Sequence, residues 1–284
     1  MNQSITPNSF QNWCQDPDRE TLVMGIINVT PDSFSDGGQF YHPEKAILHA
    51  IQLIKDGADI IDIGGESSRP GANHVLLQEE LERTIPVIQK IRQTSPDTLI
   101  SIDTYKSEVA IQAIDAGANM INDISGLTMD KTMPNIAADL GVPIVIMHMQ
   151  GTPANMQVNP HYEDLILDIT SFFSDQIKLA NIAGIKMERI ILDPGIGFGK
   201  TIDHNFQLIQ NLNEFCKLGY PILIGPSRKS FIGTTLDLPP EDRLEGTSAV
   251  VTAAIMNGAR IVRVHDVKEI KRVVTITEKI RTAA

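Results

Sequence analysis

Short apolar runs alternate with longer amphipathic stretches along almost the whole chain. The runs have the length of strands, and most are β-branched and apolar on both faces, as parallel strands covered by helices are. They occupy residues 23–29, 60–63, 99–103, 120–123, 143–147, 190–193, 221–225 and 261–264. The stretches between them predict helices near residues 44–56, 78–93, 106–116, 133–140, 161–183, 203–213, 246–257 and 267–281.

Eight strand-then-helix units predict an α/β fold, a single (β/α)8 TIM barrel with a short N-terminal extension. No Pro/Ser-rich or single-sign charged linker interrupts the pattern, so we expect one domain over residues 1–284, with the barrel at about 22–281. A doubly wound sheet is the alternative. Such sheets normally open with a glycine fingerprint, which is missing after the first predicted strand.

Composition narrows the kinds of partner that the protein can have. The net charge is −11, from 24 basic and 35 acidic residues, which argues against a protein that coats nucleic acid or an anionic membrane. The only two cysteines, Cys14 and Cys216, lack CxxC spacing and indicate a reducing compartment. The first twenty residues are polar, and no apolar run approaches the roughly 18 residues of a membrane span. We therefore expect a cytoplasmic protein without a nucleic-acid or membrane partner.

Polar residues follow every predicted strand, at the end where barrel enzymes place their chemistry. One such residue is ordinarily a helix cap or turn former, but polar groups at all eight ends indicate a functional site. Amides and carboxylates follow the middle strands, whereas cations and hydroxyls follow the last two. The strand ends carry Asn28, residues 64–70, Asp103, Asn122 with Asp123, His148, Asp193, residues 227–230, and Arg263 with His265.

This sorting predicts a small-molecule ligand with two chemically distinct ends. Barrels frequently hold phosphate after strands seven and eight, and Arg263 and His265, one residue apart, would point the same way along a strand. At the other end, a heterocycle with an N–C–NH₂ edge would match a carboxylate such as Asp193 or Asp103, beside Asn122. Either carboxylate could instead cap the turn that follows it.

Two motifs admit other interpretations. Residues 195–201 read GIGFGKT, but a phosphate-binding P-loop needs a glycine five residues before the glycine of its GK pair, and that position is Pro194. Lys229 could be the Schiff-base lysine of an aldolase barrel. Its neighbours Ser227, Arg228 and Ser230 favour anion or heterocycle binding over the apolar cage that such a lysine needs. His148 could equally be a packing residue.

Seven segments resemble, in the same order, those of the dihydropteroate synthase family of pterin-binding TIM barrels. They are GIINVTPDSFSDGG at 25–38, DIGGESSRPG at 62–71, IND at 121–123, HMQG at 148–151, LDPGIGFGK at 192–200, SRKS at 227–230 and RVHD at 263–266. The resemblance runs from about residue 23 to residue 267, and the first two segments together are its most specific part.

The resemblance implies a transferase of folate biosynthesis. Such an enzyme condenses (7,8-dihydropterin-6-yl)methyl diphosphate with 4-aminobenzoate, giving 7,8-dihydropteroate and diphosphate by a Mg²⁺-assisted dissociative displacement. It also implies a homodimer, for which the helices near 203–213, 246–257 and 267–281 are plausible contacts. Departure of diphosphate leaves positive charge on the pterin, so carboxylates there would stabilise the transition state.

Carried over to the matching positions, the resemblance implies a role for each of several residues. The catalytic residues would be Asp103, Asp193, Lys229, Arg263 and His265. The pterin would contact Asp103, Asn122, Met147, Asp193, Phe198, Gly225 and Lys229. The diphosphate would contact Asn28, Ser68, Arg69, Arg263 and His265, and Asn28 would also reach Mg²⁺. The 4-aminobenzoate would lie between loops 29–38 and 64–74, against Thr30, Pro31, Phe34, Ser67, Ser68 and Pro70.

Two positions depart from the family pattern. Ser68 stands where members commonly have Thr, which removes a methyl group near 4-aminobenzoate or its sulfonamide mimics, and Pro226 stands where a larger apolar residue is expected. Two other functions stay open at this point. A pterin-binding barrel could serve methyl transfer to a corrinoid protein, although it would not need Arg69 or the pair of Arg263 and His265. A catalytically silent barrel could bind ligand for regulation or assembly.

Overall fold

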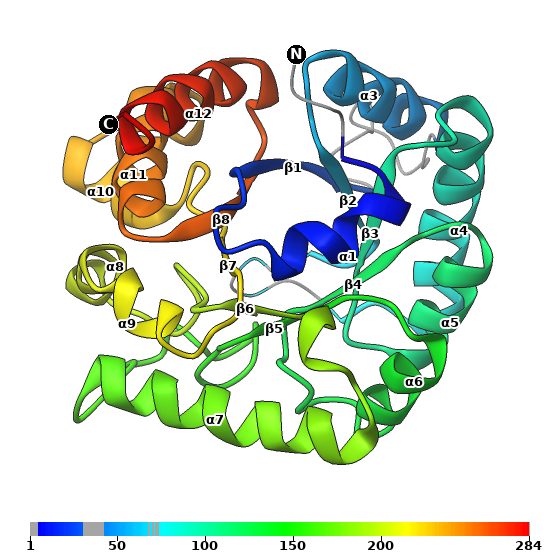
Figure 1. Cartoon of the computed structure of the whole chain (residues 1–284), viewed down its shortest axis with the longest axis horizontal. Helices are drawn as coiled ribbons and strands as arrows, with labels where there is room; N and C mark the ends of the chain where they lie inside the picture. The colour runs from blue at the N-terminus through cyan, green and yellow to red at the C-terminus, as the bar shows by residue number, and fades with distance from the viewer. Residues whose placement is uncertain (1–4, 31–42, 68, 70, 72–73, 284) are drawn as a thin grey trace.

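The strands form a closed parallel barrel in chain order, with β1 bonded to both β2 and β8. The computed structural model describes residues 5–30, 43–67, 69, 71 and 74–283 (Figure 1). The strands are β1 (Leu22–Asn28), β2 (Ile60–Gly64), β3 (Leu99–Asp103), β4 (Met120–Asp123), β5 (Ile144–Met147), β6 (Ile190–Asp193), β7 (Ile222–Ile224) and β8 (Ala259–Val264). The predicted (β/α)8 barrel is confirmed, and the doubly wound alternative is wrong.

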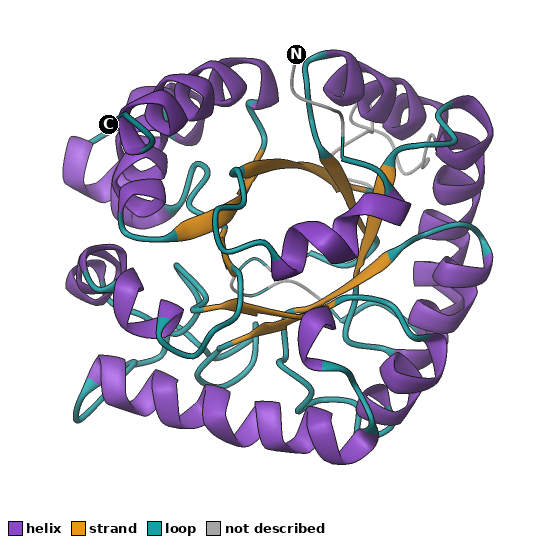
Figure 2. Cartoon of the chain, viewed as in Figure 1, coloured by secondary structure: helices purple, strands orange, loops and turns teal. Residues whose placement is uncertain are grey.

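Helices surround the barrel as an outer ring (Figure 2). They are α3 (Pro43–Lys55), α4 (Leu77–Thr94), α5 (Ser107–Asp115), α6 (Met133–Leu140), α7 (Leu165–Ala183), α8 (Ile202–Gln210), α9 (Leu212–Cys216), α10 (Ser230–Leu236), α11 (Leu244–Met256) and α12 (Val267–Arg281). Two short 3-10 helices, η1 (Met187–Arg189) and η2 (Pro240–Asp242), lie before β6 and α11. None of the described helices is long and apolar enough to cross a membrane.

Most helix ends lie within two residues of the prediction, but the helices after β5, β6 and β7 differ from it in other ways. The helix predicted from residue 161 begins at Leu165, because the Asp164 side chain accepts hydrogen bonds from the backbone N–H groups of Ile166 and Leu167. The helix predicted at 203–213 divides at Asn211 into α8 and α9. The sequence analysis missed α10, which begins inside the polar motif 227–230.

An additional helix, α1 (Pro7–Gln15), crosses the amino-terminal end of the barrel (Figure 1). Its buried side chains, Phe10, Trp13 and Cys14, pack against the residues that point into the barrel from its strands. Those inward residues are Leu22, Met24, Ile60, Leu99, Met120, Val145, Ile191, Leu223 and Ile261. The short extension is therefore part of the barrel core, and burial raises the pKa of the Cys14 thiol to about 12.

The register of the strands brings several candidate site residues to one end of the barrel. Gly64 lies opposite Asn28 on one side and Asp103 on the other, and Asp103 lies opposite Asn122. Asp193 pairs with Met147 across β5 and β6. Because all strands are parallel, these positions share the carboxyl-terminal rim.

Phe10→Ala tests whether α1 is a structural part of the barrel. Phe10 is 2% exposed, so we expect truncation to cost about 3 kcal/mol of unfolding free energy, the usual range for a buried aromatic side chain. Urea denaturation followed by circular dichroism measures this loss. Ile182→Ala, at a side chain 86% exposed on α7, is the control and should change stability little. Equal stability of the two variants would show that α1 is dispensable.

Candidate active site

An arginine from the last strand ties together two carboxylates from the second and third strands. Arg263 donates from Nε to Asp62 Oδ2 and from Nη2 to Asp103 Oδ2, each at 2.6 Å. Asn122 adds a hydrogen bond from Nδ2 to the same Asp62 oxygen at 3.1 Å. The Arg263 side chain is 19% exposed, Asp103 10% and Asp62 0%, so the cluster is shielded from bulk water.

The charges of this cluster strongly affect one another. Burial by itself lowers the pKa of Arg263, but the attraction of Asp62 and Asp103 outweighs it and raises the pKa above the usual value. Burial raises the pKa of Asp103 despite the opposing charge of Arg263, and Asp62 adds repulsion in the same direction. Two carboxylates therefore share one permanent cation at the mouth of the barrel.

Asp193, at the end of β6, lies close to the same cluster. Its Oδ1 accepts a hydrogen bond from the Gly195 backbone N–H at 2.7 Å. Burial raises the pKa of Asp193 to about 6, and this hydrogen bond together with the charge of Lys229 opposes the shift. The carboxylate is therefore mostly ionised at neutral pH and can accept hydrogen bonds from a ligand.

Lys229 places a second cation beside Asp193. Its Nζ lies 4.0 Å from the centroid of the Phe198 ring, a cation–π contact. Burial and the charge of Arg263 lower the pKa of Lys229 to about 8, against the opposing attraction of Asp193 and Asp103. A side chain at Gly197 would approach Lys229 Cδ to 2.9 Å, so glycine there makes room for the lysine.

An apolar wall faces these charges. It consists of the buried residues Ile124, Met147, Met156 and Phe198, with Tyr105 and Met149 packed against it. Gly225, which follows β7, would bring a Cβ atom within 3.8 Å of Arg263. An apolar wall beside carboxylates, an amide and cations suits a flat ligand with a polar edge.

The loop after β7 holds His265 as a neutral ring. The His265 backbone N–H donates to Ser227 Oγ at 3.2 Å, and the same oxygen lies 3.0 Å from His265 Nδ1. Burial lowers the pKa of His265 to about 3, and the charges of Arg263 and Arg228 add to this effect. Without a bound anion, His265 is therefore a neutral ring that can donate one hydrogen bond.

Arg228 is directed to a different partner. Its Nε and Nη2 donate to the two carboxylate oxygens of Asp266, at 3.0 and 2.5 Å. Its φ of 58° lies in the left-handed region, and Arg243 holds the turn by donating to the Arg228 carbonyl oxygen at 2.9 Å. This turn sets the direction of the neighbouring Lys229.

The remaining predicted site residues lie at the first two strand ends. Asn28 is half-buried at the end of β1, and Thr30 is buried just beyond it. Ser67 is half-buried and accepts a hydrogen bond from the backbone N–H of Arg69, an exposed residue, at 3.3 Å. The predicted 4-aminobenzoate and diphosphate positions that lie outside the described residues are Pro31, Phe34, Ser68 and Pro70.

Sequence analysis gave no role to Asp62 or Lys200, two residues that organise the site. Asp62 was visible as a carboxylate in the middle of a buried strand, a position that demands a charged partner. Lys200 Nζ donates to the Phe198 carbonyl oxygen at 2.9 Å and lies 3.1 Å from His148 Nδ1, which joins the loops after β5 and β6. Asp123 caps its own turn, bonding to Ser125 and Leu127.

Comparison with known proteins shows the family to which this chain belongs. The sequence profile of the family described as "Pterin binding enzyme" matches residues 24–265. The dihydropteroate synthase of Synechocystis is 52% identical over 261 residues, which are 92% of this chain and 90% of that protein. This chain therefore belongs to the pterin binding enzyme family.

Solved structures agree with this assignment. The Yersinia pestis dihydropteroate synthase, determined with a sulfonamide drug, superposes with a TM-score of 0.88 at 46% identity and covers 93% of this chain and 95% of its own. The Xanthomonas albilineans enzyme, determined with 4-aminobenzoic acid, superposes with a TM-score of 0.88 at 42% identity. The match covers 94% of this chain and 95% of that enzyme. Within its family the chain belongs to the dihydropteroate synthases, transferases of folate synthesis, as its motifs predict. This membership favours the synthase over the corrinoid alternative.

Arg263→Met tests the central ion cluster. It would leave Asp62 and Asp103 as buried carboxylates without their cation, so we expect a loss of about 3–5 kcal/mol of unfolding free energy. The loss should shrink as the pH falls from 8 to 5, because burial already raises the pKa of Asp103 and, without the charge of Arg263, this carboxylate takes up a proton in that range. Thermal unfolding at several pH values measures both effects. Lys178→Met, which breaks an exposed pair on α7, should change little, and an equally small effect for Arg263→Met would contradict the prediction.

Proposed function

We propose that this chain condenses (7,8-dihydropterin-6-yl)methyl diphosphate with 4-aminobenzoate, with the pterin held inside the carboxyl-terminal mouth of the barrel. The observation that supports this best is the buried set of carboxylates, amide and cations at one rim, facing an apolar wall. An amidine-like N–C–NH₂ edge needs acceptors, and a flat ring needs an apolar face. Both lie at the same rim of the barrel.

The pterin edge would pair with the middle strands. Asp193 is the primary acceptor in this proposal, because its ionised carboxylate can take two N–H groups of the ring. Asn122 and Asp103 would complete the edge, and Lys229 would donate to a ring acceptor. Met147 and Phe198 would pack on the face of the ring, and Gly225 leaves space beside it.

The diphosphate would lie toward the last two strands. Arg263 is already paired with two carboxylates, so it would lie between the pterin and the diphosphate and stabilise the charge that develops as the bond breaks. His265 would donate a hydrogen bond to the diphosphate from its neutral ring. Arg69 is exposed and can approach the diphosphate from the second loop, as can Ser68, which lies outside the described residues.

Mg²⁺ would be held mainly by the diphosphate itself. Among the described residues no group of three His, Cys, Asp or Glu side chains is arranged to bind a metal ion, and Asn28 offers one amide oxygen at the rim. Mg²⁺ dehydrates reluctantly and often takes substrate phosphates and water as ligands, which fits this sparse donor set. When bound, the ion neutralises charge on the leaving diphosphate.

The second substrate would bind over the first. The positions proposed to contact 4-aminobenzoate are Thr30, Ser67, and the four that the resemblance adds outside the described residues, Pro31, Phe34, Ser68 and Pro70. The Xanthomonas albilineans relative was determined with 4-aminobenzoic acid, which supports the same ligand here. The weakly basic arylamine is mostly neutral at pH 7, so no strong general base is required.

We also propose a cytoplasmic homodimer. Two free cysteines fit a reducing compartment. On α11 and α12, Met256, Ile276 and Ile280 are 49%, 63% and 58% exposed, and Phe206 on α8 is 42% exposed. Apolar side chains gathered on these helices support a subunit contact there. Sedimentation velocity tests it, because a monomer at micromolar concentration would contradict the dimer.

The activity is tested directly by product formation. The pure protein is incubated with the pterin diphosphate, labelled 4-aminobenzoate and Mg²⁺, and the label is followed into 7,8-dihydropteroate. We expect product, and we expect EDTA to suppress it because the charge of the leaving group is then unshielded. Folded protein that makes no product would rule out the proposed function and favour a catalytically silent barrel.

Asp193→Asn tests the proposed pterin acceptor. Replacing the charged acceptor should weaken pterin binding by about 10- to 100-fold, the usual cost of hydrogen bonds to charged groups. In the wild type the affinity should fall as the pH drops below about 6, where Asp193 takes up its proton, and this fall should be shallower in the variant. Calorimetry from pH 5 to 8 measures both. Asp203→Asn, at an exposed position on α8, is the control, and matching affinities for the two variants would contradict the assignment.

A further inference from the structure

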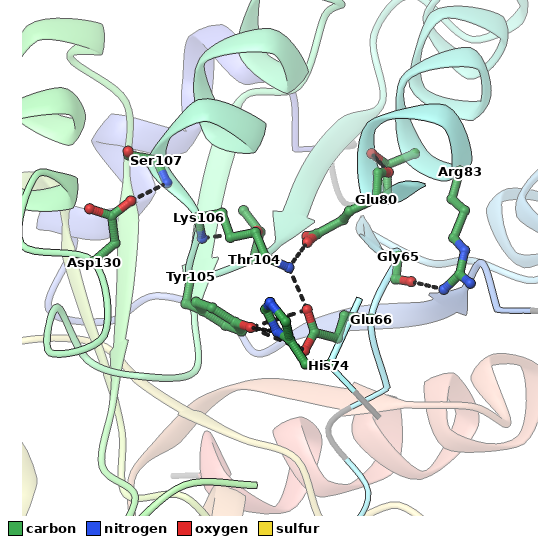
Figure 3. A network of polar contacts seen from close by, with 11 residues as sticks. Gly65, Glu66, His74, Glu80, Arg83, Thr104, Tyr105, Lys106, Ser107 and Asp130 are labelled. Carbon is green, nitrogen blue, oxygen red and sulfur yellow. Dashed lines mark hydrogen bonds and ion pairs between the residues drawn. The ribbon is translucent and has the colours of Figure 1, made fainter. Parts of the chain in front are cut away.

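A single tyrosine hydroxyl joins the two ends of the segment that follows β2. The Tyr105 hydroxyl donates to the Glu66 carboxylate, with distances of 3.1 and 3.2 Å to its two oxygens. The same oxygen lies 2.9 Å from His74 Nδ1. Figure 3 shows the three side chains converging on one point. Because a hydroxyl has one proton and two lone pairs, it can donate to Glu66 while accepting from His74.

A half-buried lysine, Lys106, fixes the first end of this segment more strongly. Lys106 Nζ donates to Glu66 Oε2 at 2.5 Å and also to Glu80 Oε2 on α4 (Figure 3). The three side chains are 14%, 17% and 1% exposed, so their attraction is only weakly screened by water. Arg83 donates to the Gly65 carbonyl oxygen at 2.6 Å. The chain immediately after β2 is therefore held from both α4 and the β3 end.

The backbone at Gly65 packs closely on α4. A Cβ atom there would lie 2.9 Å from side-chain carbons of both Glu80 and Thr84, so only glycine lets the chain approach the helix this closely. Together with the Lys106 contacts, this packing fixes the position from which the chain continues to Ser67 and Arg69.

The same network borders the proposed pterin pocket. The Tyr105 ring packs against the apolar wall that includes Met147 and Phe198. Glu80 Oε1 has no hydrogen-bond partner among the described residues, and Glu80, Asp103 and Tyr105 line a cavity of about 10 Å³, roughly the space of one water molecule. Tyr105 thus touches the wall for the first substrate with its ring and the segment for the second substrate with its hydroxyl.

We propose that Tyr105 and Lys106 are positioning residues that fix Glu66 and His74, the two ends of the segment after β2, and so place Ser67 for binding of 4-aminobenzoate, an inference that rests on the proposed function. Their contacts are with both ends of that segment and with α4. Loss of the Tyr105 hydroxyl should therefore weaken the binding of 4-aminobenzoate and leave the binding of the pterin diphosphate unchanged. A network that only stabilised the fold would affect both substrates equally or neither.

Tyr105→Phe is the most selective test, because it removes one oxygen and keeps the ring on the apolar wall. We expect the KM for 4-aminobenzoate to rise about 10-fold, the size of one lost hydrogen bond to a charged group. The KM for the pterin diphosphate should change by less than about twofold, and kcat should stay near the wild-type value, as for a loss of ground-state binding. Steady-state kinetics with each substrate varied in turn measures this split.

His74→Ala tests whether His74 influences 4-aminobenzoate binding through the Tyr105 hydroxyl. If His74 acts through the Tyr105 hydroxyl, the double variant Tyr105→Phe/His74→Ala should have the same KM for 4-aminobenzoate as Tyr105→Phe alone, because the two changes remove one shared interaction. Tyr220→Phe is the matched control. Tyr220 is buried just before β7, at the amino-terminal end of the barrel, and its variant should leave both KM values unchanged.

Hydrogen exchange gives a second readout that needs no catalysis. In Tyr105→Phe the amides of residues 65–67 should exchange faster, while those of β3 keep their protection. Unchanged exchange, an unchanged KM for 4-aminobenzoate, or an equal rise in both KM values would each overturn the inference. Failure of the proposed function is distinguishable, because the wild type itself would then form no product.

Discussion

The whole carboxyl-terminal end of the barrel depends on the pairing of Arg263 with Asp62 and Asp103. The arginine comes from β8 and the carboxylates from β2 and β3, so the pairing spans the mouth of the barrel. Ionised groups in so shielded a place are tolerated only when each has a partner of opposite charge. Closure of the barrel is what brings these partners together.

Once this pairing exists, it sets the ionisation of its neighbours. The positive charge of Arg263 helps to keep His265 neutral and to lower the pKa of Lys229, which burial already depresses. The same cations act on Asp193 in the opposite way to burial. They lower its pKa and so offset part of the rise that burial causes. A ligand with a donor-rich edge and an anionic tail meets acceptors on one side and donors on the other. The same electrostatics thus serve folding and recognition.

The fold was largely predictable because its strands are apolar on both faces and several of its helices end at glycine. Helix α1 was not predicted, since three apolar side chains in a short polar segment reveal their partner only when the barrel closes. The strand-end residues were predicted as a set. Their pairings were not: Asp62 sits inside an apolar run, and its contact with Arg263 joins residues 201 positions apart. Arg228 looked like an anion ligand, yet its Nε and Nη2 donate to Asp266.

The last helix and the residues just before β1 meet at the amino-terminal end of the barrel. Thr21 donates to Glu278 at 2.5 Å, and Arg281 donates to the Arg19 carbonyl oxygen at 3.5 Å, so α12 returns to the place where β1 begins. The substrate-binding rim lies at the opposite end of the strands. A second enzyme or an affinity tag joined after α12 would therefore stand at the end of the barrel opposite to the path of substrates.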